Sequence, residues 1–140
     1  VAIRGDNLDE AIAKTSDALA LAPGDIGVAF QLGVLLYRAE RLDEAKSAFE
    51  RAILFNDSYS NARYFLGLIW DRKGDKDAAL SQFQKILALN PESDEIKRII
   101  VNLEAGRSAL SGIVPPAAAP EARKEAPVRE GEGRQPLPRR

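Results

Sequence analysis

Few residues of this chain have the types and spacing that chemistry requires. Asp75-Lys76-Asp77 resembles the start of a calcium-binding loop, because carboxylates two positions apart can reach one cation. No glycine follows at the sharp turn and no glutamate closes the loop, so we interpret Asp75 as a cap of the next helix. The chain contains no His and no Cys, although its composition still permits a serine–lysine pair. We therefore expect no catalytic site, no metal site and no cofactor.

Composition limits the classes of partner. The 140 residues amount to a single domain, and a net charge of −1 gives no broad attraction to nucleic acid or anionic lipid. No apolar run approaches the roughly 20 residues that a membrane-spanning helix needs. We expect neither nucleic-acid binding nor direct insertion into a membrane.

The elements that must position any site are set by an internal repeat. The segment 26–59 reappears as 60–93, so that equivalent residues lie 34 positions apart, the period of a helix-turn-helix repeat. The matching positions of the two copies carry Leu32-Gly33, Ala45, Phe49, Ala52 and Asp57 in the first, and Leu66-Gly67, Ala79, Phe83, Ile86 and Pro91 in the second.

Two glycines and two apolar stripes predict how each repeat packs. Gly33 and Gly67 lie inside predicted helices, where Gly costs about 1 kcal/mol relative to Ala, and such a cost is tolerated where backbones come close. We expect the close neighbours to be Ala45 and Ala79 on the following helices. Apolar residues at helical spacing form one stripe on each helix, and the second stripe extends to Phe55. Two such helices form an antiparallel pair that must stack on a neighbouring pair.

These residues resemble the tetratricopeptide repeat family, in which a Leu-Gly pair lies on the first helix, Ala and Phe lie on the second, and Pro follows. The resemblance implies an all-α fold, a right-handed α-solenoid of antiparallel helix pairs. We expect a repeat domain over residues 1–112, with a partial repeat at 1–25, full repeats at 26–59 and 60–93, and a capping helix at 93–112. Trp70 is expected in the core.

Helices are predicted at about 8–22, 26–39, 43–55, 59–73, 77–89 and 93–110. Residues 1–5 are predicted to be the end of an earlier helix, with Asp6 or Asn7 capping the next one. The chain would then begin inside a repeat, as a fragment of a longer protein. In the last helix we expect Asn102 on the charged, solvent-facing side and Gly112 at the end.

The segment 113–140 differs in composition from the rest. Six of the eight prolines fall there, with few aliphatic residues. Such a segment cannot bury enough apolar surface to offset its loss of conformational entropy, so we predict a disordered tail. Gln135 to Arg140 could instead be a short docking peptide.

The family resemblance implies that the first helices of successive repeats line a concave, peptide-binding face. The residues expected on this face are Phe30, Gln31, Val34, Tyr37, Arg38, Asn61, Tyr64, Phe65, Leu68 and Arg72. The Lys and Asn residues with which some family members bind a terminal carboxylate are absent: Phe30 and Val34 occupy two of those positions. What remains is a partly aromatic strip, which would mark a binding site if exposed and belongs to the core if buried.

We predict a non-catalytic scaffold that binds a peptide or amphipathic helix of another protein. Two alternatives stay open: a soluble C-terminal appendage of a larger bacterial membrane protein such as an envelope glycan ligase, and a subunit that self-associates through its repeat ends. The ligase alternative rests on a weak resemblance around residues 102–110. A cytoplasmic location is the default, and an envelope-associated one follows if an anchor precedes the chain.

Overall fold

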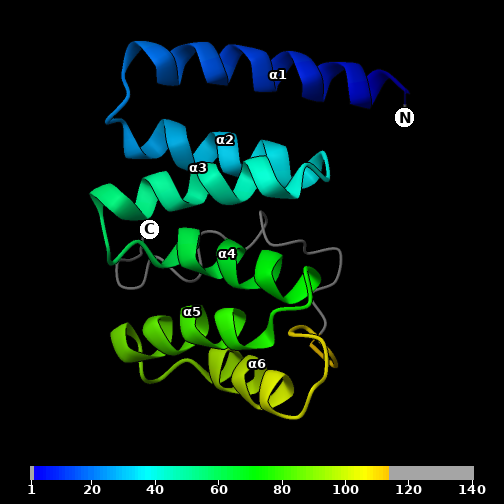
Figure 1. The fold of residues 1–140 in the computed structure, drawn as a ribbon, viewed down its shortest axis with the longest axis vertical. Helices are drawn as coiled ribbons and strands as arrows, with labels where there is room; N and C mark the ends of the chain where they lie inside the picture. The colour runs from blue at the N-terminus through cyan, green and yellow to red at the C-terminus, as the bar shows by residue number, and fades with distance from the viewer. Residues whose placement is uncertain (1, 114–140) are drawn as a thin grey trace, which may run out of the picture. The chain divides into compact units, whose positions relative to one another are not determined.

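The computed structural model describes residues 2–113, with side chains described from residue 7 onward, and within this range it contains six α-helices and no strand (Figure 1). The helices are α1 (Ala2–Leu21), α2 (Ile26–Arg38), α3 (Leu42–Phe55), α4 (Ser60–Arg72), α5 (Lys76–Leu89) and α6 (Asp94–Glu104). The expected all-α helical-repeat fold is confirmed. The chain divides into two compact units, one from Val1 to Ala62 and one beginning at Arg63, and each is described by itself.

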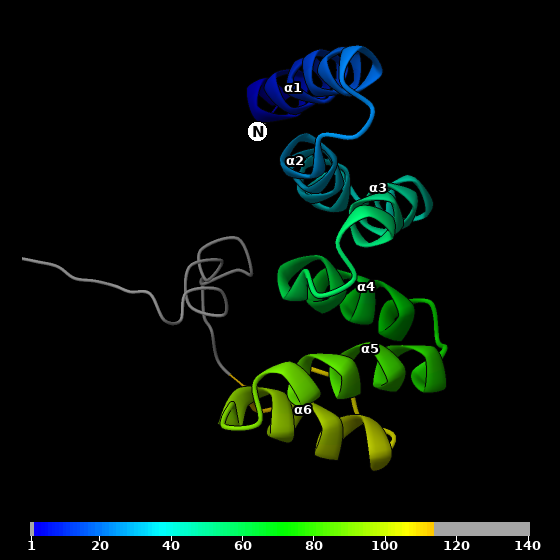
Figure 2. The same ribbon diagram turned by 90° about the vertical axis from the view of Figure 1, so that its left-hand side faces the viewer.

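The first unit contains α1, α2 and α3, with α2 packed against both of the others (Figures 1 and 2). Its core contains one apolar stripe from each helix, as the periodicity predicts. The buried members are Ile12, Leu19, Ala29, Leu32, Leu36, Ala45, Ala48, Phe49 and Ala52. Phe49 is fully buried, and its ring centroid lies 5.6 Å from that of Phe30.

The second unit contains most of α4 together with α5 and α6, and α5 packs against α6. Leu66, Ile69, Phe83 and Ile99 are its largest fully buried side chains. The ring of Tyr64 meets that of Phe83 edge-on, at a centroid distance of 5.7 Å, an arrangement that aromatic pairs favour. Trp70 is half-buried in α4, so it is only partly a core residue.

The two helical glycines mark close approaches, but their neighbours are not those expected. A Cβ at Gly33 would lie 2.6–2.8 Å from three ring atoms of Phe49, and a Cβ at Gly67 would overlap the ring of Phe83 in the same way. The expectation that Ala45 and Ala79 are the nearest neighbours is therefore wrong. In each repeat the missing side chain makes room for the phenylalanine of the following helix.

The ends of the helices explain why the central four match their predicted limits to within one residue. Asp25, Asp75 and Ser93 accept hydrogen bonds at the starts of α2, α5 and α6, from the backbone N–H groups of residues 28, 78 and 96. Three helices end in the same turn, in which a residue with positive φ reverses the chain: Glu40 after α2, Gly74 after α4 and Gly106 after α6. After α6, Arg107 N–H donates to Asn102 C=O and Gly106 N–H to Leu103 C=O, the Schellman pattern.

The two terminal helices differ from the prediction. α1 is continuous from Ala2, so Asp6 and Asn7 do not cap a new helix. One helical glycine, Gly5, costs too little to interrupt a helix that has favourable residues on both sides. α6 ends at Glu104 and not near Leu110, because Gly106, with φ of 80°, ends the helix six residues before Gly112.

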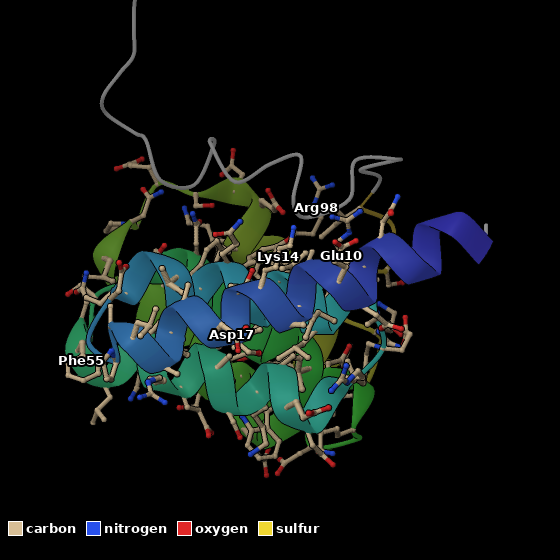
Figure 3. All side chains as sticks on the ribbon, turned by 90° about the horizontal axis from the view of Figure 1, so that it is seen from above. Glu10, Lys14, Asp17, Phe55 and Arg98 are labelled. Atoms are coloured by element: carbon tan, nitrogen blue, oxygen red, sulfur yellow. The ribbon has the colours of Figure 1, made fainter. Side chains whose placement is uncertain are left out.

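Two side chains lie on the opposite side from that expected. Asn102 is 4% exposed and belongs to the interior of the second unit, not to the charged side of α6. Phe55, predicted in an apolar stripe, is 54% exposed at the end of α3 (Figure 3). Residues 114–140, which hold nearly all of the predicted disordered tail, lie outside the described part of the chain.

Candidate functional site

The expected binding face is best represented on α2, in the first unit. Gln31 and Arg38 are exposed, while Phe30, Val34 and Tyr37 are half-buried. Phe30 lies against the rings of Phe49 and of Tyr59, whose centroid is 5.2 Å away, so its ring is fixed by the core. The surface of α2 therefore carries two exposed polar side chains, next to three half-buried side chains that are mainly apolar.

On α4 the expected residues have a different environment. Tyr64, Phe65 and Leu68 are 7%, 3% and 4% exposed, and Asn61 is buried as well. Among the α4 positions expected on the face, only Arg72 is exposed. The strip of apolar and aromatic side chains on α4 is thus part of the interior. A binding patch would require these side chains to be exposed, and on α4 they are not.

A polar contact fixes Tyr64 within the second unit. Its hydroxyl donates to Glu95 Oε2 at 2.9 Å, joining α4 to α6, while its ring packs on Phe83. Buried phenols usually find such a partner, because an unpaired hydroxyl is costly in an apolar environment. Tyr64 is therefore a structural residue, with its ring and hydroxyl both held in place.

Sequence reasoning missed a polar network that fixes the chain after α6. Asp71 accepts hydrogen bonds from Lys76 Nζ at 2.6 Å and from Ala109 N–H at 2.9 Å. Asn102 Nδ2 donates to the carbonyls of Ala109 and Ser111, both at 2.9 Å, and its Oδ1 accepts from Arg107. Asp71 and Ala109 lie 38 residues apart, so no local pattern would have revealed the contact between them.

The described residues offer no metal cluster: no three His, Cys, Asp or Glu side chains among them converge. Asp75 accepts a hydrogen bond from Ala78 N–H at 2.9 Å, which confirms the capping interpretation of this residue. Perturbed groups have structural causes. Burial raises the pKa of Tyr59, and the hydrogen bonds from Arg41 lower the pKa of the exposed Glu44 carboxyl. Within residues 2–113, no helix has the length and apolar content needed to cross a bilayer.

Comparison with known families identifies the repeat. The tetratricopeptide repeat family model matches residues 30–94, which cover most of the first predicted repeat and all of the second. The resemblance to the tetratricopeptide repeat family is therefore confirmed over these residues. Repeats of this family generally act as non-catalytic scaffolds for protein–protein interaction, and no curated protein sequence matches the chain significantly.

Solved structures share this fold. A tetratricopeptide repeat protein from Parabacteroides merdae superimposes with a TM-score of 0.66 at 21% identity, covering 74% of this chain and 41% of that one. The crystal structure of MamA superimposes with a TM-score of 0.68 at 24% identity, covering 84% of this chain and 70% of that one. This chain thus spans less than half of the Parabacteroides protein, and at these identities the likeness shows the fold alone.

Proposed function

We propose that the repeats bind a peptide or an amphipathic helix of another protein on the exposed face of α2, the first helix of the first full repeat. The observation that carries the proposal is the surface of α2. Gln31, Val34 and Arg38, at positions i, i+3 and i+7, share one face of a helix whose opposite side is anchored in the core by Leu32 and Leu36.

This face suits a ligand with regularly spaced polar groups. Gln31 and Arg38 are two helical turns apart, roughly 10 Å along the axis. The amide of Gln31 can donate to and accept from a peptide backbone, and the guanidinium of Arg38 favours a carboxylate. Phe30, Val34 and Tyr37 would contribute the partly covered apolar contacts beside them. Because the core holds α2, little ordering entropy opposes binding.

A charge-reversal variant with a matched control tests the proposal. Gln31→Glu with Arg38→Glu should weaken binding of the partner at least tenfold, a loss of about 1.4 kcal/mol, because the face loses its donor and cation together. Gln84→Glu with Lys85→Glu makes the same charge changes on exposed positions of α5 and should leave binding unchanged. The partner is first obtained by affinity capture with the unaltered protein, and its affinity for each variant is then measured by isothermal titration calorimetry.

Far-ultraviolet circular dichroism of both variants must equal that of the unaltered protein, so that any loss concerns the surface. If the captured partner bound the α2 variant as tightly as the control, the face of α2 would not be the site.

A further inference from the structure

A groove of about 270 Å³ lies in the first unit between α1 and α3, on a floor provided by α2. Its apolar lining consists of Ile12, Leu19, Leu32, Leu36 and Ala48. α1 and α3 run in the same direction, with their C-terminal ends on the same side, and α2 packs against both (Figures 1 and 3). We call this site the α1–α3 groove. It is lined by residues of α2 other than Gln31 and Arg38, so it is distinct from the face proposed above.

One of the charges along this groove is already neutralised. Arg41 donates from Nε and from Nη2 to the two carboxylate oxygens of Glu44, at 2.7 and 2.9 Å. A bidentate pair of this kind uses both oxygens of the carboxylate. Glu44 therefore adds no uncompensated negative charge that would repel an anionic ligand.

Arg51 supplies the remaining charge. Its Nε donates to the carbonyl of Pro23 at 3.2 Å, which directs the guanidinium toward the end of α1. Within the described residues, the carbonyl of Pro23 is the hydrogen-bond acceptor of Arg51. A backbone carbonyl carries no net charge, so it does not neutralise the positive charge of the guanidinium. The two terminal nitrogens retain donors in the fork geometry that matches a carboxylate. The groove thus has an apolar floor and a cation beside it, with the hydroxyls of Ser16 and Ser47 in the lining.

We propose that the α1–α3 groove binds an extended acidic peptide segment of another protein, inserting one aliphatic side chain while a neighbouring Asp or Glu pairs with Arg51. The volume is below the 300–1,000 Å³ usual for small-molecule sites, so it suits one or two side chains of a longer ligand. Charge complementarity favours an acidic segment. The apolar floor would accept any aliphatic side chain of the peptide, whereas Arg51 favours peptides in which an acidic residue lies next to that side chain.

The equivalent position of the next repeat carries a larger side chain than Ala48. Thirty-four residues after Ala48 the chain has Gln82, which is half-buried and accepts a hydrogen bond from Arg63 Nη1 at 2.9 Å. Ala48 lines the groove from α3 with a small side chain. Ala48→Gln therefore introduces the residue that the second repeat has at the equivalent position, and its larger side chain should fill the groove.

The test uses the full chain and a defined probe. The probe is a library of acetylated, amidated hexapeptides that each carry one aliphatic and one acidic residue, separated by zero, one or two positions. Binding is followed by chemical-shift changes of the backbone amides in ¹⁵N-labelled protein. We expect members of the library to shift the amides around Ile12, Leu36 and Ala48, and peptides with Gln in place of the acid to bind about tenfold more weakly.

The variants separate the two contributions. Arg51→Gln should reduce affinity for the acidic peptides about tenfold and remove their advantage over the Gln peptides, whereas Ala48→Gln should reduce binding of both. Lys85→Gln removes the exposed cation at the equivalent position of the second repeat and should change nothing. The Gln31→Glu/Arg38→Glu variant should bind the library normally, so the two proposed sites fail or survive separately.

Three results would overturn the proposal: no member of the library shifts these amides, the Gln peptides bind as well as the acidic ones, or Arg51→Gln binds like the unaltered protein.

Discussion

At the scale of single residues, the absence of a side chain at Gly33 determines whether α2 and α3 can pack. A methyl group would gain about 1 kcal/mol of helix propensity, but it would lie 2.6 Å from the ring of Phe49, which is fully buried. Overpacking of this kind costs roughly 1–3 kcal/mol, so the clash outweighs the gain. Gly33→Ala should lower the free energy of unfolding by about 1 kcal/mol, measured by urea denaturation.

Gly27 provides the control in the same helix. A Cβ there meets only Asp25 Oδ1, at 3.4 Å, so Gly27→Ala should be neutral or stabilising by up to about 1 kcal/mol. Equal effects of the two substitutions would show that the ring of Phe49 does not determine the choice of glycine. The sequence predicted that Gly33 marks a close approach. It could not predict the neighbour, because Phe49 and Ala45 both face α2 and only the packed side-chain positions distinguish them.

At the scale of elements, the turn after α2 contains a strained residue that the other first helices avoid. Glu40 has φ of 63°, whereas the equivalent positions after α4 and α6 are Gly74 and Gly106. A left-handed conformation costs a residue with a Cβ roughly 1–2 kcal/mol. Replacement by Gly removes this cost, but only part of it is recovered as stability, because Gly loses more conformational entropy when the chain folds. Glu40→Gly should therefore raise the free energy of unfolding by about 0.5–1 kcal/mol in urea denaturation.

The reciprocal substitution checks the cause. Gly74→Glu places a side chain at φ of 89°, where nothing lies within 4 Å of the new Cβ, so any loss of stability comes from the backbone and not from a clash. It should lower the free energy of unfolding by about 1 kcal/mol. A neutral Gly74→Glu would contradict this explanation of the turn.

How far the sequence predicts each element depends on whether its ends are encoded locally. The four central helices have Asp or Gly residues at their ends or repeat the 34-residue pattern, and they were placed correctly. α6 was predicted too long because Gly106 and Gly112 are both plausible ends, and the contacts of Asn102 select the first. On the candidate site, the family resemblance implies that Gln31 and Arg38 lie on the face, and both are exposed. The burial of Tyr64 and Phe65 depends on tertiary packing that periodicity does not contain.

At the scale of the whole molecule, a repeat protein should transmit a local loss of stability only weakly, because each repeat contacts mainly its neighbours. The chain forms two compact units, and the network around Asn102 lies entirely in the second. Asn102→Ala would leave the carbonyls of Ala109 and Ser111 without their donor and would cost roughly 1–3 kcal/mol.

Hydrogen–deuterium exchange by mass spectrometry can locate that cost. In Asn102→Ala, amides of α5, α6 and residues 105–113 should exchange faster, roughly tenfold or more for a loss above 1.4 kcal/mol, while those of α2 and α3 change much less. Gly33→Ala should give the reverse pattern, with faster exchange in α2 and α3, which excludes a general effect of lower stability. Equal acceleration throughout residues 8–113 in both variants would mean that the two units unfold as one cooperative body, because a single global opening would then expose every amide.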